Sequence, residues 1–213
     1  MDIGAQTVRD WMATLQQQIV SSTTYAGIPT VKSPLDAWIY QEIIWERKPQ
    51  YIVEIGNWCG GSLLMLAHWL DALGHGVVIG VDIDHSRIAP LALAHPRVHL
   101  VTGDAAAVAP HVYSLIKPDA EVPVIEDSSH ECAQTLEVLR AYEELVRPGG
   151  YFIVEDTICW HGLDVGPQPG PWEAVQTFLA EQPGRWTVDR RREKFQVSWN
   201  PGGYLKREPQ SHA

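Results

Sequence analysis

The chain has 213 residues, and 26 acidic against 16 basic side chains give it a formal net charge of −10. This length fits one domain with a full α/β core, and the acidic balance argues against a nucleic-acid partner, because phosphate binding requires a basic face. With no run of about 20 apolar residues for a membrane span and no basic, apolar start typical of a signal peptide, we expect a cytoplasmic protein without a membrane partner.

Residues 1–48 are expected to form a helical segment that serves as a lid or as an oligomer contact. Residues 5–20 carry apolar side chains at the spacing of one helix face. A loop then leads to a second helix at about 34–47, where Ser33 is the expected cap and Pro34 the first helical residue.

After this segment, short apolar runs alternate with helical patterns. The predicted strands are 51–55, 77–82, 98–102, 122–127 and 151–156, and the predicted helices are 61–73, 85–94, 104–117, 130–146 and 172–182. Continuous apolar strands between helices indicate a mostly parallel sheet that is covered on both faces. Two late strands, 185–189 and 195–199, are expected to pair antiparallel at one edge. The sequence thus predicts a Rossmann-like, doubly wound α/β domain over 49–205, followed by a flexible tail at 206–213.

A glycine-rich turn follows the first predicted strand. Ligands of open α/β sheets bind beyond the carboxyl ends of the strands, and glycines there allow a tight turn and a close approach of backbone N–H groups to an anionic group. The spacing Gly-x-x-x-Gly-Gly differs from that of nicotinamide dehydrogenases and lacks the Lys-Ser/Thr end of a P-loop. We therefore expect a ligand with a carboxylate at this turn. Its expected binding residues are Glu54, Gly56, Trp58, Gly60 and Ser62.

The next two strand ends also carry acidic residues. Asp82 suits a bidentate hydrogen bond to ribose hydroxyls, and Asp104 suits an adenine amino group. A glycine turn by itself is often only structural. Three consecutive strand ends with these residues favour an adenosyl ligand.

Carboxylates follow the fourth and fifth predicted strands, at Asp127 and at Glu155 and Asp156. Neighbouring parallel strands would bring them to one edge of the sheet, where they repel each other unless a cation or protons intervene. Oxygen ligands in this number suit Mg²⁺, which keeps some waters and leaves room for substrate oxygens. The alternative is that Asp127 or Ser128 only caps the following helix. Glu126, on the opposite side of the strand, is expected to face away from the site.

Over residues 50–156 these motifs resemble the class I S-adenosylmethionine-dependent methyltransferases. The resemblance implies that Gly56, Gly60 and Ser62 contact the methionyl part of the cofactor. It also implies that Asp82 holds the ribose, and it places Asp104 near the adenine.

The acidic residues are similar to those of the metal-dependent small-molecule O-methyltransferases typified by catechol O-methyltransferase. In that family an Asp after strand four and an acidic pair after strand five bind Mg²⁺, which implies Asp127, Glu155 and Asp156 as ligands here. A base lies three residues beyond the first Asp, at His130, where the catechol enzyme has a lysine. Imidazole titrates near neutral pH and suits this role; the alternative for a lone histidine is a solvated or capping residue.

A closer resemblance is to the cephalosporin hydroxylase/rhamnosyl O-methyltransferase family. It is carried by Tyr40-Gln41-Glu42-Ile43-Ile44, Gly60-Gly61-Ser62, Asp127-Ser128-Ser129-His130, Arg147-Pro148-Gly149-Gly150-Tyr151, Val154-Glu155-Asp156-Thr157 and Asn200-Pro201-Gly202-Gly203-Tyr204-Leu205. The likeness implies methyl transfer to a hydroxyl of a small-molecule acceptor in natural-product or sugar tailoring, by a homo-oligomer. Trp160 and His161, which follow the acidic pair, are then expected to wall the acceptor pocket.

Two other functions stay open at this point. A metal-dependent hydroxylase or hydrolase could retain the same fold, although no iron-binding triad is visible. A non-catalytic partner protein could bind S-adenosylmethionine structurally, although such a protein needs no acidic metal site. The sequence does not identify the methyl acceptor.

Overall fold

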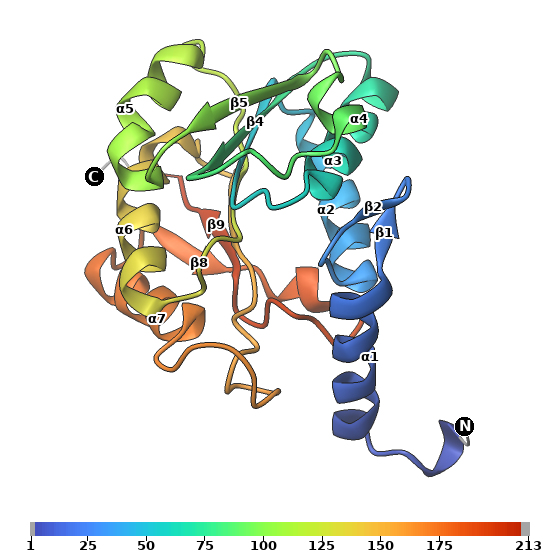
Figure 1. Ribbon diagram of the computed structural model, residues 1–213. Helices are drawn as coiled ribbons and strands as arrows, with labels where there is room; N and C mark the ends of the chain where they lie inside the picture. The colour runs from blue at the N-terminus through green and yellow to red at the C-terminus, as the bar shows by residue number, and fades with distance from the viewer. Residues whose placement is uncertain (1–2, 210–213) are drawn as a thin grey trace.

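The computed structural model describes residues 3–209 and contains a seven-stranded sheet in the order β5-β4-β3-β6-β7-β9-β8 (Figure 1). The strands are β3 (Tyr51–Ile55), β4 (Val77–Asp82), β5 (Val98–Thr102), β6 (Val124–Glu126), β7 (Tyr151–Val154), β8 (Trp186–Val188) and β9 (Tyr204–Arg207). The strands from β5 to β7 pair in parallel, and β9 runs antiparallel to both β7 and β8. This confirms the predicted doubly wound α/β fold.

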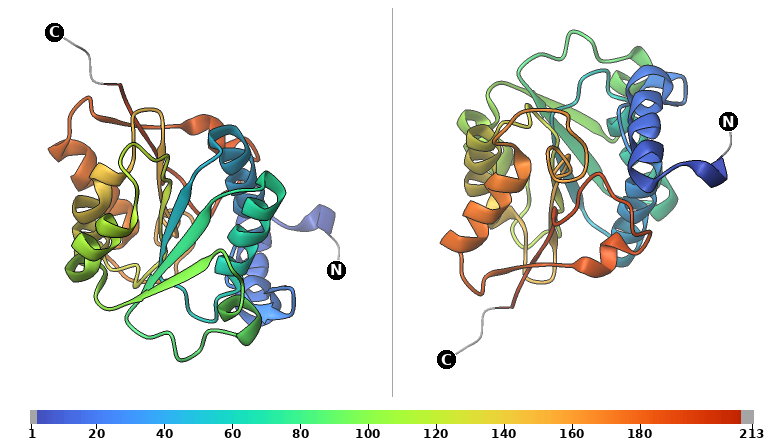
Figure 2. Two further views of the ribbon diagram at one scale, coloured as in Figure 1. Left: turned by 90° about the horizontal axis from the view of Figure 1, so that it is seen from above. Right: turned by 90° about the horizontal axis from the view of Figure 1, so that it is seen from below.

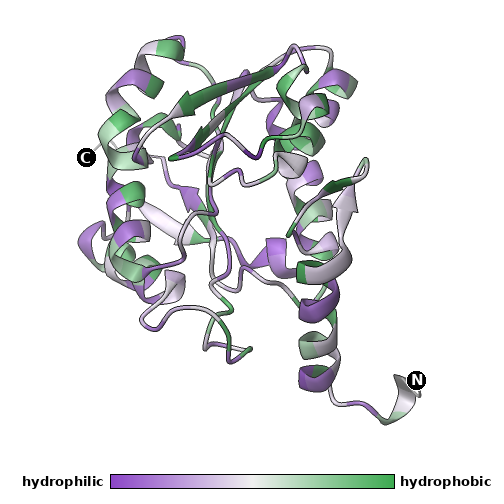
Figure 3. Cartoon of the chain, viewed as in Figure 1, coloured by the Kyte–Doolittle hydropathy of each residue, from purple (hydrophilic) through white to green (hydrophobic). Residues whose placement is uncertain are grey.

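Helices cover both faces of the sheet (Figure 2). On one face lie α2 (Pro34–Arg47), α3 (Gly61–Leu73) and α4 (Pro90–Leu93), and on the other α5 (Ala105–Leu115), α6 (Cys132–Tyr142) and α7 (Pro171–Glu181). Short 3-10 helices occur at η1 (Ile3–Ala5), η2 (Glu143–Leu145) and η3 (Arg190–Glu193). Hydrophobic residues concentrate on parallel strands such as β4 and β5 and alternate with hydrophilic ones along the helices, whereas β9 is largely hydrophilic (Figure 3). No helix among the described residues is both long and apolar enough to cross a bilayer.

The N-terminal segment contains α1 (Val8–Ser22) and a hairpin of β1 (Thr24–Tyr25) and β2 (Ile28–Pro29). The hairpin lies where the sequence predicts only a loop. Ala26 and Gly27 both have positive φ, which a tight two-residue turn requires. Helix α1 buries Ile19 in a small cluster with the C-terminal half of the chain, formed with Ile158, Leu163 and Trp199.

The predicted edge pair is correct for one strand only. Residues 195–199 form no strand, and β8 pairs instead with β9. The cause is the buried carboxylate of Asp36 on α2, which accepts hydrogen bonds from Ser198 Oγ (2.6 Å), Trp199 N (2.8 Å) and Tyr204 Oη (2.7 Å). The bonds from Ser198 and Trp199 hold this segment against α2, and the bond from Tyr204 attaches the start of β9 to the same carboxylate.

Two predicted boundaries also move. The expected tail begins later, because Lys206 and Arg207 pair in β9; residues 210–213 lie outside the described residues. The expected helix over 85–94 shrinks to α4. Asp84 accepts hydrogen bonds from Ser86 N and Ser86 Oγ, both at 2.8 Å, which favours a turn at this point.

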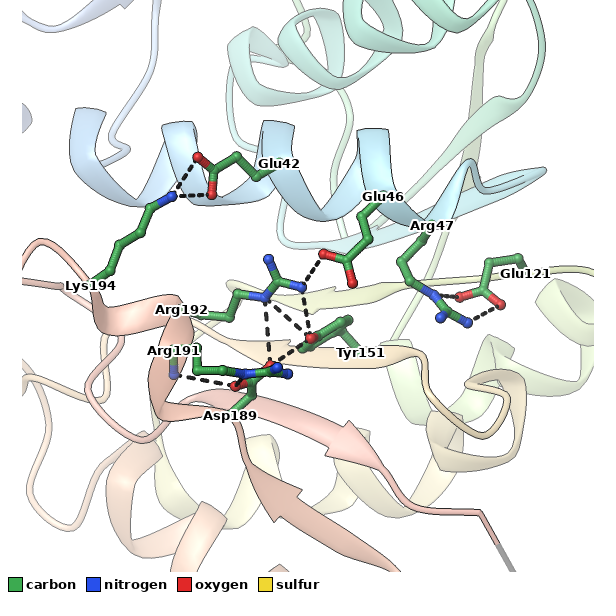
Figure 4. Close-up of polar contacts among 9 residues, drawn as sticks. All are labelled: Glu42, Glu46, Arg47, Glu121, Tyr151, Asp189, Arg191, Arg192 and Lys194. Atoms are coloured by element: carbon green, nitrogen blue, oxygen red, sulfur yellow. Dashed lines mark hydrogen bonds and ion pairs between the residues drawn. The ribbon is translucent and has the colours of Figure 1, made fainter.

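Helix α2 is attached to the C-terminal segment by ionic contacts, which Figure 4 shows. Asp189 is nearly buried and accepts hydrogen bonds from Arg191 Nε (2.8 Å) and Tyr151 Oη (2.7 Å). Arg192 donates to the Tyr151 hydroxyl at 2.9 Å and pairs with Glu46 on α2 at 2.6 Å. The network therefore connects α2, β7 and η3, and it attaches the N-terminal segment to the sheet.

Replacing Asp189 with Asn is expected to lower the free energy of unfolding at pH 7 by about 2 kcal/mol, because charge-assisted hydrogen bonds are lost. The bonds from Arg191 and Tyr151 hold the pKa of Asp189 well below its usual value. The stabilisation is therefore present above the ordinary Asp pKa of about 3.9 and is lost as the pH falls toward the depressed value.

Urea denaturation at pH 7 and pH 3.5 measures this difference, and the gap between wild type and D189N should narrow in acid. The exposed Asp119 offers a control, since D119N should change stability by less than about 0.5 kcal/mol. An equal deficit of D189N at both pH values would contradict the assignment.

Candidate active site

A cavity of about 410 Å³ lies beyond the carboxyl ends of the central strands, where the strand order reverses between β3 and β6. This is the point at which open α/β sheets bind ligands. Its walls are the turn after β3, residues 81–84 after β4, Gly103 and Ala105 after β5, and residues 127–129 after β6. Residues 29–32 of the N-terminal segment close the remaining side. The cavity thus lies between the glycine turn and the N-terminal segment.

The glycine turn is held tightly against β6. Gly56 has φ +86°, and a Cβ built on it would lie 1.9 Å from the carbonyl oxygen of Asp127. Asn57 N and Trp58 N donate to Asp82 Oδ2 at 2.7 and 3.3 Å. The backbone of the turn therefore requires a glycine at 56 and is attached to the end of β4 through the Asp82 carboxylate.

The predicted cofactor residues occupy two different positions. Four of them line the cavity, namely Gly56, Trp58, Ser62 and Asp82. The other three do not: Glu54, Gly60 and Asp104. Each of these three has a contact elsewhere that explains its position.

Glu54 is fully buried below the turn and accepts a hydrogen bond from Ser62 Oγ at 2.9 Å; burial raises its pKa. Gly60 precedes α3 with φ +81°, and its Cβ position faces Ile88 and Ala92. Asp104 caps α5 by accepting from Ala107 N at 3.0 Å. Glu54 and Asp104 thus support the turn and the helix that border the cavity.

His85 is a further polar residue near the turn that the sequence did not single out. Its ring lies 3.1 Å from Asn57 Oδ1 and 2.8 Å from Thr102 Oγ1, and burial lowers its pKa. It connects the glycine turn to the end of β5. The sequence analysis placed His85 in a helix over 85–94, and it therefore did not predict the contacts of His85 with Asn57 and Thr102.

Asp127, His130 and Asp156 form a group in which one ligand atom from each residue lies within 4.8 Å of the others. His130 Nε2 is 3.3 Å from Asp156 Oδ2 and 3.9 Å from Asp127 Oδ1. Burial, opposed by His130 and assisted by the Asp127 charge, raises the pKa of Asp156 to about 6. His130 and Asp156 both have positive φ. Such backbone strain in bulky residues is found at functional sites, where the surrounding structure holds it.

Glu155 lies outside this group. Its carboxylate contacts Lys32 Nζ, which is also 2.6 Å from Asp127 Oδ2 and 3.4 Å from Glu54 Oε1. Burial and the neighbouring Asp127 raise the pKa of Glu155 well above its usual value. Burial would lower the pKa of Lys32, but the three carboxylates raise it well above normal. Sequence reasoning missed Lys32, because a lysine in a loop 95 residues before Asp127 carries no local signal.

The helix-capping alternative for Asp127 and Ser128 does not hold. Helix α6 begins at Cys132, its N-cap is Glu131, and no side chain caps it. Ser128 Oγ instead donates to Glu126 on the opposite side of β6. Glu126 is buried, and burial raises its pKa to about 8.

The loop after β7 returns toward His130. Cys132 N donates to Pro169 O, and a Cβ on Gly170 would lie 3.7 Å from the His130 carbonyl oxygen. Within this loop the His161 side chain is already engaged by residues of α7. Its ring stacks on Trp172 with centroids 4.1 Å apart, and its Nε2 lies 2.8 Å from Glu173 Oε1. Trp160 remains 44% exposed. Of the two residues expected to line the acceptor pocket, Trp160 is thus the one with an exposed ring.

Comparison with known proteins assigns this arrangement to a family. Residues 17–208 match the family described as Rhamnosyl O-methyltransferase/CmcI. The rhamnosyl O-methyltransferase of Mycobacterium tuberculosis (strain H37Rv) is 33% identical over 193 residues, covering 88% of this chain and 79% of the relative. That of Mycobacterium leprae (strain TN) is 33% identical over 195 residues, covering 88% and 84%.

Solved structures agree with this assignment. A structure described as cmcI-D160 Mg-SAM superposes with a TM-score of 0.71 at 25% identity, covering 89% of this chain and 78% of that one. An O-methyltransferase from Bacillus cereus in complex with SAH shares the fold, with a TM-score of 0.57 at 18% identity over 87% and 84% of the two chains. The chain therefore belongs to the rhamnosyl O-methyltransferase/CmcI family of class I S-adenosylmethionine-dependent O-methyltransferases.

Proposed function

We propose that this protein transfers a methyl group from S-adenosylmethionine to a hydroxyl of a sugar carried by a small molecule, with Mg²⁺ at the acidic group. The observation that carries the proposal is the position of Asp127. It lines the cofactor cavity and also belongs to the group with His130 and Asp156. The cofactor site and the acceptor site would thus be adjacent at Asp127. In-line transfer requires this, because the acceptor oxygen must lie next to the methyl group of the donor.

The cavity suits the methyl donor. Gly56 and Ser62 lie beside the N-terminus of α3, where backbone N–H groups favour the methionyl carboxylate. Asp82 lies on the cavity wall after β4 and is the proposed ribose ligand. The acidic residues nearby favour the positively charged sulfonium and amino groups of the donor.

The acidic group fits a divalent cation by its donor set. Asp127 and Asp156 supply the carboxylate oxygens that Mg²⁺ prefers, and their ligand atoms lie within 4.8 Å of one another and of His130. Asp127 and Asp156 would hold the ion, together with Glu155 if its carboxylate turns from Lys32. Bound there, Mg²⁺ would lower the pKa of an acceptor hydroxyl.

His130 is the proposed base. Its Nε2 can take the hydroxyl proton, and the Asp156 carboxylate at 3.3 Å would stabilise the imidazolium that results. Trp160 offers an exposed aromatic surface on the adjoining loop, which suits the apolar face of a sugar ring. The sugar acceptor is proposed because the two mycobacterial relatives are named rhamnosyl O-methyltransferases.

The test is incubation of the protein with methyl-labelled S-adenosylmethionine, Mg²⁺ and a panel of rhamnosides and other deoxysugar glycosides. We expect one labelled methyl ether, and its formation should stop with excess EDTA and return with added Mg²⁺. Binding of S-adenosylhomocysteine without transfer to any glycoside would overturn the sugar assignment. Absence of that binding would overturn the cofactor assignment itself.

A further inference from the structure

Lys32 carries the positive charge at the centre of the acidic residues. Its side chain is only 6% exposed and contacts Asp127 and Glu155, with Glu54 at 3.4 Å. Among these three partners, Glu54 and Glu155 are also buried. A buried charge is retained only when opposite charges and hydrogen bonds compensate it. Lys32 and these carboxylates therefore depend on one another.

The lysine divides the carboxylates between two sides. Asp127 directs Oδ2 to Lys32 and Oδ1 toward His130, whereas Glu155 is engaged by Lys32. Asp156 lies on the His130 side. Asp156 and one oxygen of Asp127 thus face the proposed metal. Glu155 and the other oxygen of Asp127 are compensated by Lys32.

We propose that Lys32 is a positioning residue that acts as a built-in counter-cation: it orders Asp127 and Glu155 before a metal binds and limits the affinity of the site for the divalent ion. The inference rests on the metal site of the proposed function. The effect on affinity follows from charge. Without the Lys32 ammonium, which contacts Asp127 and Glu155, the acidic residues carry one more uncompensated negative charge. A divalent cation would then take over the role of the lysine.

The test is Lys32→Met, which removes the charge and keeps an unbranched side chain of similar length. Without metal, we expect its melting temperature to fall by about 10 °C, since uncompensated buried carboxylates are strongly destabilising. Mg²⁺ should restore much of this loss, and Mn²⁺, followed by electron paramagnetic resonance, should bind about tenfold more tightly than to wild type. Both readouts use the whole chain without methyl donor.

Two further variants separate positioning from simple loss of structure. Lys194→Met removes the ion pair with Glu42 on α2, outside the acidic group, and should leave metal affinity unchanged. Lys32→Met combined with Glu155→Gln restores the charge balance, so its melting temperature without metal should recover toward wild type. If K32M does not fold without metal, folding on addition of Mg²⁺ but not of KCl at equal ionic strength is the expected result.

The outcomes distinguish the two proposals. Metal binding to wild type with equal or weaker binding to a folded K32M would overturn the role of Lys32 and leave the metal site intact. A K32M that folds in neither condition, while the double variant folds, would also overturn it. Absence of Mn²⁺ binding to both wild type and K32M would overturn the metal site, and the Lys32 proposal with it.

Discussion

Replacement of His130 with Ala is expected to reduce the rate of methyl transfer by about a thousandfold while S-adenosylhomocysteine binds as before. The imidazole is the one nitrogen base in the group with Asp127 and Asp156, and its Nε2 lies 3.3 Å from the Asp156 carboxylate. It does not line the cofactor cavity. The loss should therefore appear in turnover and not in cofactor affinity. Single-turnover assays beside calorimetric titration of S-adenosylhomocysteine measure both.

His161 provides a matched control for this variant. It follows the same strand, but its ring is stacked on Trp172 and paired with Glu173. His161→Ala should change turnover far less than His130→Ala. Unchanged turnover of H130A with intact cofactor binding would rule out the base role.

Replacement of Gly56 with Ala is expected to destroy the cofactor site. The added methyl group would lie 1.9 Å from the Asp127 carbonyl oxygen, which is backbone and cannot rotate away. Asp127 N donates to Ile55 O at 2.8 Å, so relief would separate β6 from β3 at the cavity floor. We expect binding of S-adenosylhomocysteine to weaken at least a hundredfold and the free energy of unfolding to fall by about 3 kcal/mol.

Gly74 separates conformational strain from this clash. It has φ +78°, similar to Gly56, but its Cβ position has no atom within 4 Å. Gly74→Ala should cost only the strain of the left-handed conformation, about 1 kcal/mol, and should leave cofactor binding unchanged. Equal effects of G56A and G74A on binding would show that the contact with Asp127 is not the cause.

The parallel part of the sheet could be predicted because each strand is a local apolar run. Strands β3, β4 and β5 occupy the predicted residues. Burial on both faces leaves a clear apolar pattern in β3 and β4, whereas the edge strand β5 is only partly buried. The antiparallel partner of β8 could not be predicted in this way. Its choice depends on Asp36, a carboxylate more than 160 residues away that binds the alternative segment.

For the site as well, the sequence predicts residues that belong to a local motif but not contacts between residues far apart in the chain. The sequence identified Asp127 and Asp156 because each follows a strand end, and the carboxyl ends of neighbouring parallel strands lie at one edge of the sheet. It identified His130 through the family resemblance, which places a base three residues after the first Asp. It could not show that Glu155 is held by Lys32, because their contact spans 123 residues. Nor could it show the positive φ of His130 and Asp156, because a left-handed conformation of a residue other than glycine is uncommon and has no clear sequence pattern.

The hydrogen bonds of Asp36 also have a consequence for the growing chain on the ribosome. Ser198, Trp199 and Tyr204, which bind its carboxylate, are translated long after α2. At about 5–20 residues per second, the interval is roughly 10 to 30 s. During this time the Asp36 carboxylate lacks these three hydrogen-bond donors, so the face of α2 that carries it remains incomplete. The nascent polypeptide should therefore acquire its catalytic pocket late, in one of the last steps of its maturation.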